Sequence, residues 1–193
     1  MENSLIFISI ASLLVLYSYF FYIKDIFALN TKPHVYTWFV ATIVIFINTL
    51  AMIKGGSGYS SAPFIVGTIM CFVVFILCFK FGTKNINKND FIFLLLALLC
   101  LVLYLFSINL FYVVTLFVLI DLFAYIPTIR KTWYEPETEN FNYYFISFFI
   151  NLLFLFSLKN HNFLILAYPV FLLLTNMVLC AEIFFRKRHL NVK

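Results

Sequence analysis

The segment FINTL at residues 46–50 returns as FINLL at residues 149–153, with an asparagine inside an apolar run both times. At the same offset of 103 residues, Tyr22-Ile23 falls on Tyr125-Ile126 and Pro33 falls on Pro136. Apolar matches alone mean little in so apolar a chain. The matched asparagine and proline carry the argument that the chain contains an internal repeat.

The composition places this repeat in a membrane. Of the 193 residues, 64% are hydrophobic and 11% are charged, whereas a soluble domain has about 45–50% apolar and about 25% charged residues. A water-soluble globule and a disordered chain are both excluded, because disorder requires low hydrophobicity. We expect an all-α integral membrane protein with no room for a soluble catalytic or nucleic-acid-binding domain.

Polar segments divide the chain into seven apolar runs of about twenty residues, which is the length of a membrane-spanning helix. The runs cover residues 4–23, 34–53, 62–81, 90–107, 109–129, 140–158 and 162–185. The offset superimposes the first three runs on the last three. The predicted fold is therefore two parallel three-helix repeats joined by a linker helix (3+1+3), with boundaries at 1–82, 83–108 and 109–193, the last including a basic tail.

Counting lysines and arginines predicts the orientation of these seven transmembrane helices. Only Lys54 and Lys159 belong to one side of the membrane. The positive-inside rule then predicts an outside N-terminus and a cytoplasmic C-terminus. The basic residues of the predicted inner side are Lys24, Lys32, Lys80, Lys84, Lys88, Arg130, Lys131, Arg186, Lys187, Arg188 and Lys193.

Four polar side chains inside the apolar runs are candidates for a substrate site. Asp121 is a carboxylate deep within a run, so it must face a cavity, be paired or be protonated. It is either a protonatable or cation-binding group, or a structural group bonded to a hydroxyl such as that of Tyr125. Asn48 and Asn151, with Asn176 as a third candidate, suit solute hydroxyl or amide groups; joining helices is the alternative role.

Aromatic and proline residues supply candidates for gating. Trp38 is either part of an aromatic gate at the substrate site or a member of an interfacial belt. Pro127 removes a backbone donor inside the fifth helix, where it either forms a hinge, with Tyr125 and Thr128 beside it, or ends the helix. Pro33 and Pro136 are expected to open helices in their first turns, with Glu137 and Glu139 favouring the helix that follows Pro136.

Motifs for catalysis or cofactor binding are lacking in the sequence. The four cysteines lie singly in apolar runs, and His34, His161 and His189 are too scattered for a metal site. The sequence has no HExxH or GxSxG segment. We therefore expect neither an enzyme nor a bound metal or cofactor.

One segment carries a resemblance to a known family. The stretch DLFAYIPTIRK at residues 121–131 is similar to the Pro-Gln segment of the SWEET and PQ-loop (MtN3-like) superfamily, with Thr128 in place of glutamine. Together with residues 32–38 (KPHVYTW) and 136–139 (PETE), it more closely resembles a group of uncharacterised bacterial membrane proteins. The resemblance implies a multi-pass protein of the bacterial inner membrane.

The repeat, the central asparagines and the buried Asp121 favour a small-solute transporter with a polar site between the repeats, alternating access and a proton link through Asp121. Its partners would be a small polar solute, the lipid bilayer and a second copy of the chain, but not nucleic acid. The alternative is a non-transporting receptor or partner-binding protein on the same fold, which would dock its partner at the acidic loop 133–139.

Overall fold

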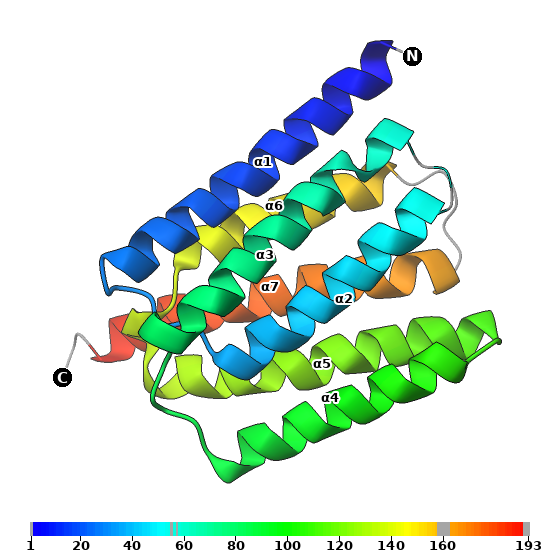
Figure 1. Ribbon diagram of the computed structural model, residues 1–193. Helices are drawn as coiled ribbons and strands as arrows, with labels where there is room; N and C mark the ends of the chain where they lie inside the picture. The colour runs from blue at the N-terminus through cyan, green and yellow to red at the C-terminus, as the bar shows by residue number, and fades with distance from the viewer. Residues whose placement is uncertain (1, 55, 57, 158–162, 191–193) are drawn as a thin grey trace.

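The computed structural model describes residues 2–54, 56, 58–157 and 163–190, and these residues form a bundle of seven long helices (Figure 1). Residues 159, 161 and 193, which entered the predictions above, lie outside the described part. The long helices are α1 (Glu2–Phe27), α2 (Val35–Lys54), α3 (Ala62–Phe81), α4 (Lys88–Phe106), α5 (Leu110–Tyr134), α6 (Phe141–Ser157) and α7 (Phe163–Leu190), with two short 3-10 turns, η1 (Gly58–Ser61) and η2 (Pro136–Thr138).

Six of these helices are long and apolar enough to cross a membrane, and α6 is a shorter apolar helix of 17 residues. The described residues contain no strand. The predictions of an all-α, multi-pass membrane protein and of seven helices at these places are therefore confirmed.

Polar side chains set several helix boundaries. Asn87 accepts a hydrogen bond from the backbone of Asp90, and Asp90 accepts one from the backbone of Asn87, so that a capping box starts α4. Asn109 caps α5 through the backbone of Phe111, and Asn140 accepts from the backbone of Tyr143 at the start of α6.

The prolines between the helices differ from the prediction. Pro33 precedes α2 instead of lying in its first turn, and Pro136 opens η2 instead of α6. Because α6 begins only at Phe141, Glu139 is not in its first turn either. The expectation that Pro33 and Pro136 open the long helices is therefore wrong.

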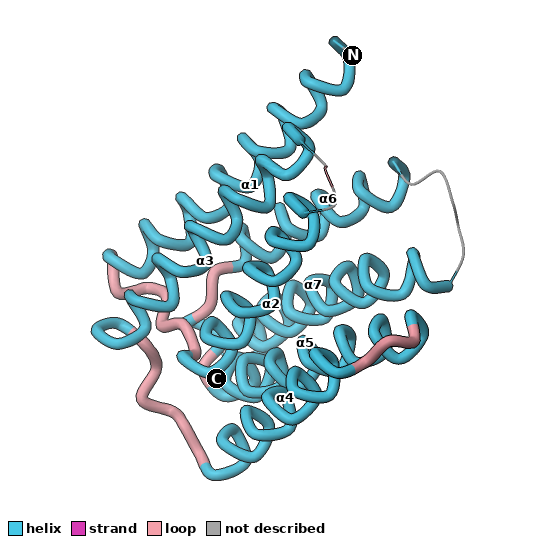
Figure 2. The backbone as a smooth tube through the Cα atoms, turned by 45° about the vertical axis from the view of Figure 1, so that its right-hand side comes forward, coloured by secondary structure: helices cyan, strands magenta, loops and turns pink. Residues whose placement is uncertain are grey.

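The first three and the last three helices pack in the same order. Helix α3 packs on both α1 and α2, and α7 packs on both α5 and α6. Between the triplets, α1 packs on α6 and α2 packs on α5, while α4 lies outside, against α5 and α2. Figure 2 shows α4 and α5 side by side at one edge of the bundle.

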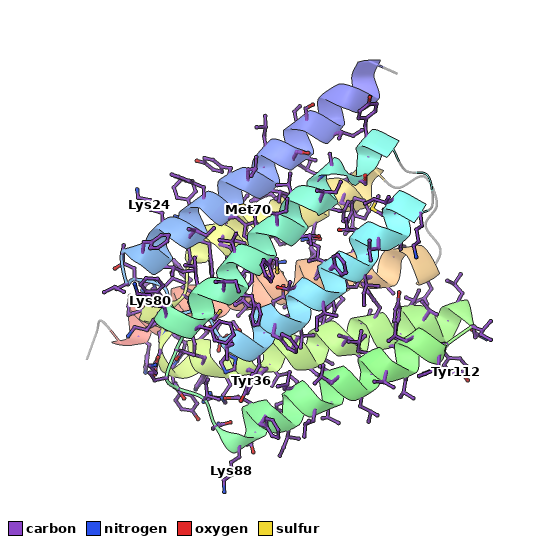
Figure 3. All side chains as sticks on the ribbon, in the orientation of Figure 1. Lys24, Tyr36, Met70, Lys80, Lys88 and Tyr112 are labelled. Carbon is purple, nitrogen blue, oxygen red and sulfur yellow. The ribbon has the colours of Figure 1, made fainter. Side chains whose placement is uncertain are left out.

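The two ends of the bundle differ in charge. We call the end where α1, α3, α5 and α7 terminate the basic end. In Figure 3, Lys24, Lys80 and Lys88 lie at this end and Tyr112 lies at the other. Of the eleven basic residues predicted for one side, ten belong to the basic end and the eleventh is undescribed, whereas Lys54 ends α2 at the opposite end.

Candidate functional site

A cavity of about 530 Å³ lies between the two helix triplets. All six helices of the triplets contribute to its wall, and α4 contributes none of its described lining residues. The volume falls within the range of about 300–1,000 Å³ that is typical of small-molecule sites. Along α2 the lining runs from Thr37 to Met52, so the cavity extends over most of the length of that helix.

The structure brings together every residue that the sequence proposed for a substrate site. These residues, together with the proposed gating residue Tyr125, line the cavity: Asn48, Asn151, Asn176, Asp121 and Trp38. The two other gating candidates, Pro127 and Thr128, are buried in α5 and are absent from the lining.

Asp121 is the charged side chain of the cavity wall and is only 3% exposed. The hydroxyl of Tyr168, on α7, donates to its Oδ2 at 2.7 Å. The structural alternative, a hydrogen bond from a hydroxyl such as that of Tyr125, is therefore met by the hydroxyl of Tyr168. Sequence reasoning missed Tyr168 because its helix is remote in the chain and no spacing pattern connects the two residues.

The three asparagine side chains do not join helices among the described residues. Asn151 donates to the carbonyl oxygen of Ser147 at 2.8 Å and Asn176 donates to that of Leu172 at 2.7 Å, each one turn back on its own helix. The Asn48 amide makes no hydrogen bond within the described part of the chain. Polar capacity therefore remains on all three amides for a molecule in the cavity.

Aromatic rings form much of the wall on the side of the basic end. Trp38 is 5% exposed and lies with its ring centroid 5.8 Å from that of Tyr143, so it belongs to the interior and not to an interfacial belt. The rings that line the cavity here are those of Tyr19, Trp38, Tyr125, Tyr143 and Tyr144.

A buried ion pair closes the basic end beneath these rings. Lys131, fully buried, donates to Glu139 Oε1 at 2.7 Å and to the backbone carbonyls of Lys32 and Thr138 at 2.8 and 3.1 Å. Glu139 Oε2 accepts from the hydroxyl of Tyr22 at 3.3 Å.

The hydroxyl of Tyr22 in turn accepts from Trp38 Nε1 at 3.3 Å. A chain of polar contacts thus runs from the cavity wall to Lys131 and connects α1 and α2 with α5 and the loop before α6.

A second charged cluster lies beside it. Arg130 donates to both oxygens of Asp90, at 2.8 and 2.7 Å, and to the side chain and backbone of Asn85. His34 is fully buried with Nε2 3.5 Å from Asp90, and neither ring nitrogen has a hydrogen-bond partner. Burial lowers the pKa of His34 from 6.5 to about 4, and the Asp90 carboxylate, which raises the pKa, does not outweigh this.

Pro127 does not end α5, which continues to Tyr134. The helix-ending interpretation of Pro127 is therefore wrong. Proline leaves the carbonyl four residues earlier without its helical donor, and next to this weakened turn the Thr37 hydroxyl donates to the carbonyl of Ala124 at 2.6 Å. Thr128 donates to the same Thr37 hydroxyl at 2.9 Å, so that α2 and α5 are joined at this point.

Comparisons of the chain with protein-family models, with curated proteins and with solved structures give no match. Within the described residues no group of histidine, cysteine or acidic side chains could hold a metal ion. The cavity is therefore the feature of the molecule that points to a function.

Proposed function

We propose that the protein is a small-solute membrane carrier whose binding site is the cavity between the two helix triplets. The observation that carries the proposal is the cavity itself: six helices surround it, and its wall holds three amides with unused polar capacity and the carboxylate of Asp121, which has no ion-pair partner among the described residues. Polar groups inside a membrane bundle are costly and usually mark a solute pathway.

The two triplets act as equivalent halves in this proposal, with 1–82 and 109–193 as repeats and 83–108 as the linker. Their shared order of packing supports it. The cavity lining supports it as well, because many lining residues of the first triplet have a lining residue at the equivalent repeat position of the second. At the offset of 103 the lining pairs are Ser18 and Asp121, Ala41 and Tyr144, Val44 and Ser147, and Asn48 and Asn151.

Helices α3 and α7 follow the same pattern with an offset of 105. There the lining pairs are Pro63 and Tyr168, Phe64 and Pro169, Gly67 and Leu172, and Cys71 and Asn176. The pairs are equivalent in position but differ in chemistry, since Asp121 faces the cavity where the first half has Ser18. A pseudo-symmetric wall with one acidic side suits a solute that is itself asymmetric.

The cavity reaches close to one end of the bundle and is closed at the other, which supports an alternating-access mechanism. The lining reaches Met52 and Pro63, close to where α2 ends and α3 begins, whereas the Lys131–Glu139 pair closes the basic end. With the basic end in the cytoplasm, as the positive-inside rule favours, this state faces outward. Opening towards the cytoplasm would require this pair to release its hydrogen bonds to the first half, at the Lys32 carbonyl and the Tyr22 hydroxyl.

Uptake into proteoliposomes tests the carrier function. The purified protein is reconstituted, and the uptake of labelled glucose, glutamine, lysine and choline is compared with that of empty liposomes. We expect saturable uptake of at least one probe. The variant Asp121→Asn should remove any dependence of that uptake on a pH gradient, whereas Glu137→Gln, which alters an exposed carboxylate outside the cavity, should not. Equal signals from protein-containing and empty liposomes for all four probes would contradict the proposal.

The receptor alternative receives less support from the structure. Its acidic loop has two carboxylates engaged internally: Glu139 with Lys131, and Glu135, which accepts from Asn85 at 3.0 Å. The third, Glu137, is the one that remains exposed, and it contacts Lys187 at 3.4 Å. Because two of its three carboxylates are bonded within the bundle, the loop has little free charge with which to bind a partner.

A further inference from the structure

We propose that the cavity binds a monovalent organic cation, an amine or quaternary ammonium ion with an apolar body. The inference deepens the proposed function by naming the class of solute, and its biological use rests on that function. The binding step itself stands on three features of the cavity: its charge, its aromatic wall and what its lining lacks.

The charge comes from Asp121. Its side chain is 97% buried, and it forms no ion pair with any described lysine, arginine or histidine. Tyr168 donates to Oδ2, while Oδ1 accepts no hydrogen bond from the described residues. A buried carboxylate without a counter-charge is costly, and a cation bound in the cavity supplies that charge.

The aromatic wall suits the same ligand. An ammonium ion over the face of a tryptophan or tyrosine ring gains about 0.5–1 kcal/mol at exposed sites and about 2 kcal/mol when desolvated. The indole of Trp38 and the phenol rings of Tyr19 and Tyr143 lie within 6.1 Å of one another, centroid to centroid, on one side of the cavity. Quaternary ammonium groups are recognised by clusters of aromatic rings, and these three rings all line the cavity.

The lining also excludes other solutes. No described residue that lines the cavity is a lysine, an arginine or a histidine, so a solute carboxylate or phosphate would meet no counter-charge there. An amino acid would therefore bind less well than the corresponding amine. A neutral polyol would leave the Asp121 charge uncompensated.

Three ligands of nearly equal shape separate these cases. Choline is the cation, 3,3-dimethylbutan-1-ol is its neutral isostere, and glycine betaine carries the same ammonium group with an added carboxylate. Binding of each to the purified full-length protein in detergent is measured by isothermal titration calorimetry. We expect choline to bind at least about 10-fold more tightly than either of the others, which is about 1.4 kcal/mol.

Variants of Asp121 and Tyr143 test whether these side chains bind choline. Asp121→Asn should weaken choline at least about 10-fold and leave the neutral isostere unchanged. Tyr143→Leu should weaken choline more than Tyr143→Phe, which keeps the ring, does. The matched control Glu137→Gln removes an exposed carboxylate outside the cavity and should change neither ligand.

The proposal is overturned if choline does not bind, if either of the other two ligands binds the wild-type protein as tightly as choline, or if a folded Asp121→Asn variant keeps its choline affinity. The first two comparisons need no variant, so a failure of Asp121→Asn to fold leaves them intact. Charge-selective binding without uptake of any of the four labelled probes into proteoliposomes would support the ligand class and refute the carrier. Uptake of glucose without choline binding would do the reverse.

Discussion

Buried charges at the basic end are paired with opposite charges, whereas the buried carboxylate of the cavity, Asp121, has no such partner among the described residues. At the basic end, Lys131 is paired with Glu139 and further held by two backbone carbonyls, and Arg130 binds Asp90 with two hydrogen bonds. In the cavity, Asp121 has one partner among the described residues, the neutral hydroxyl of Tyr168. The two regions lie in the same bundle and are joined through Trp38 and Tyr22.

This difference in pairing distinguishes charges that stabilise the fold from a charge that is available for function. Charges that satisfy one another need nothing from outside, and the Lys131–Glu139 pair also bonds to the first half at Lys32 and Tyr22. A charge that the fold buries and leaves unsatisfied is instead available to a ligand or a proton. If this distinction is right, removing charges in the two regions should have opposite effects on stability.

The largest expected effect is that of Lys131→Met. The variant leaves the Glu139 carboxylate buried without its cation, which costs about 3–5 kcal/mol in the free energy of unfolding. Unfolding by guanidinium in detergent, followed by tryptophan fluorescence, measures the loss.

The double variant Lys131→Met, Glu139→Gln provides the control, because it removes both charges. It should lose less stability than Lys131→Met alone. A single variant as stable as the wild type would show that the pair does not close the basic end.

The sequence predicted the bundle better than it predicted this closure. Apolar runs of about twenty residues identify spanning helices directly, and a lone acid or amide inside such a run is visible by its rarity. Asp121 and Asn48 were found in this way. Lys131, by contrast, looked like one more cytoplasmic basic residue, and Glu139 like an acid near a helix start.

Only the fold shows that these two belong together. Helix α5 continues past Arg130 and Lys131 to Tyr134. The short turn η2 then reverses the chain so that Glu139 reaches Lys131. Neither the spacing nor the hydropathy encodes this return, since it depends on the three-dimensional path of the loop. The same holds for Tyr168, which reaches Asp121 from another helix.

Acid should weaken the basic end through His34, which faces Asp90, Arg130 and Lys131. The unfolded chain binds a proton at His34 with a pKa of 6.5, while burial lowers the folded value to about 4. Stability is therefore full above pH 6.5 and falls as the pH drops towards 4. The loss approaches about 1.4 kcal/mol for each pH unit.

Melting temperatures of the wild type and of His34→Gln between pH 7 and 4 isolate this effect from that of the carboxylates. The wild type should lose more stability than the variant over this range. Parallel curves for the two proteins would exclude His34 as the source of the acid sensitivity.

A smaller effect is expected where α2 meets α5 beside Pro127. Thr128→Val keeps the shape of a side chain that is 1% exposed but removes its hydrogen bond to Thr37. We expect a loss of about 1 kcal/mol in the free energy of unfolding. Thr115→Val is the control in the same helix and should cost less, because within the described part of the chain Thr115 bonds only to the backbone of its own helix at Phe111. Equal losses would remove the argument that this contact joins the two halves.

The smallest effect, and the one of opposite sign, belongs to Asp121→Asn. Asparagine has nearly the shape of aspartate and can still accept from Tyr168, but it carries no charge that must be buried. We expect the free energy of unfolding in the absence of ligand to stay the same or to rise by about 1 kcal/mol.

Addition of choline should then stabilise the wild type, because a ligand that binds only the folded state raises its stability. The stability of Asp121→Asn should not change when choline is added. Thermal melts of both proteins with and without choline measure the two effects together. A loss of several kcal/mol on replacing Asp121 would place this carboxylate with Lys131 and Glu139 among the groups that hold the fold, and the distinction between the two regions would fail.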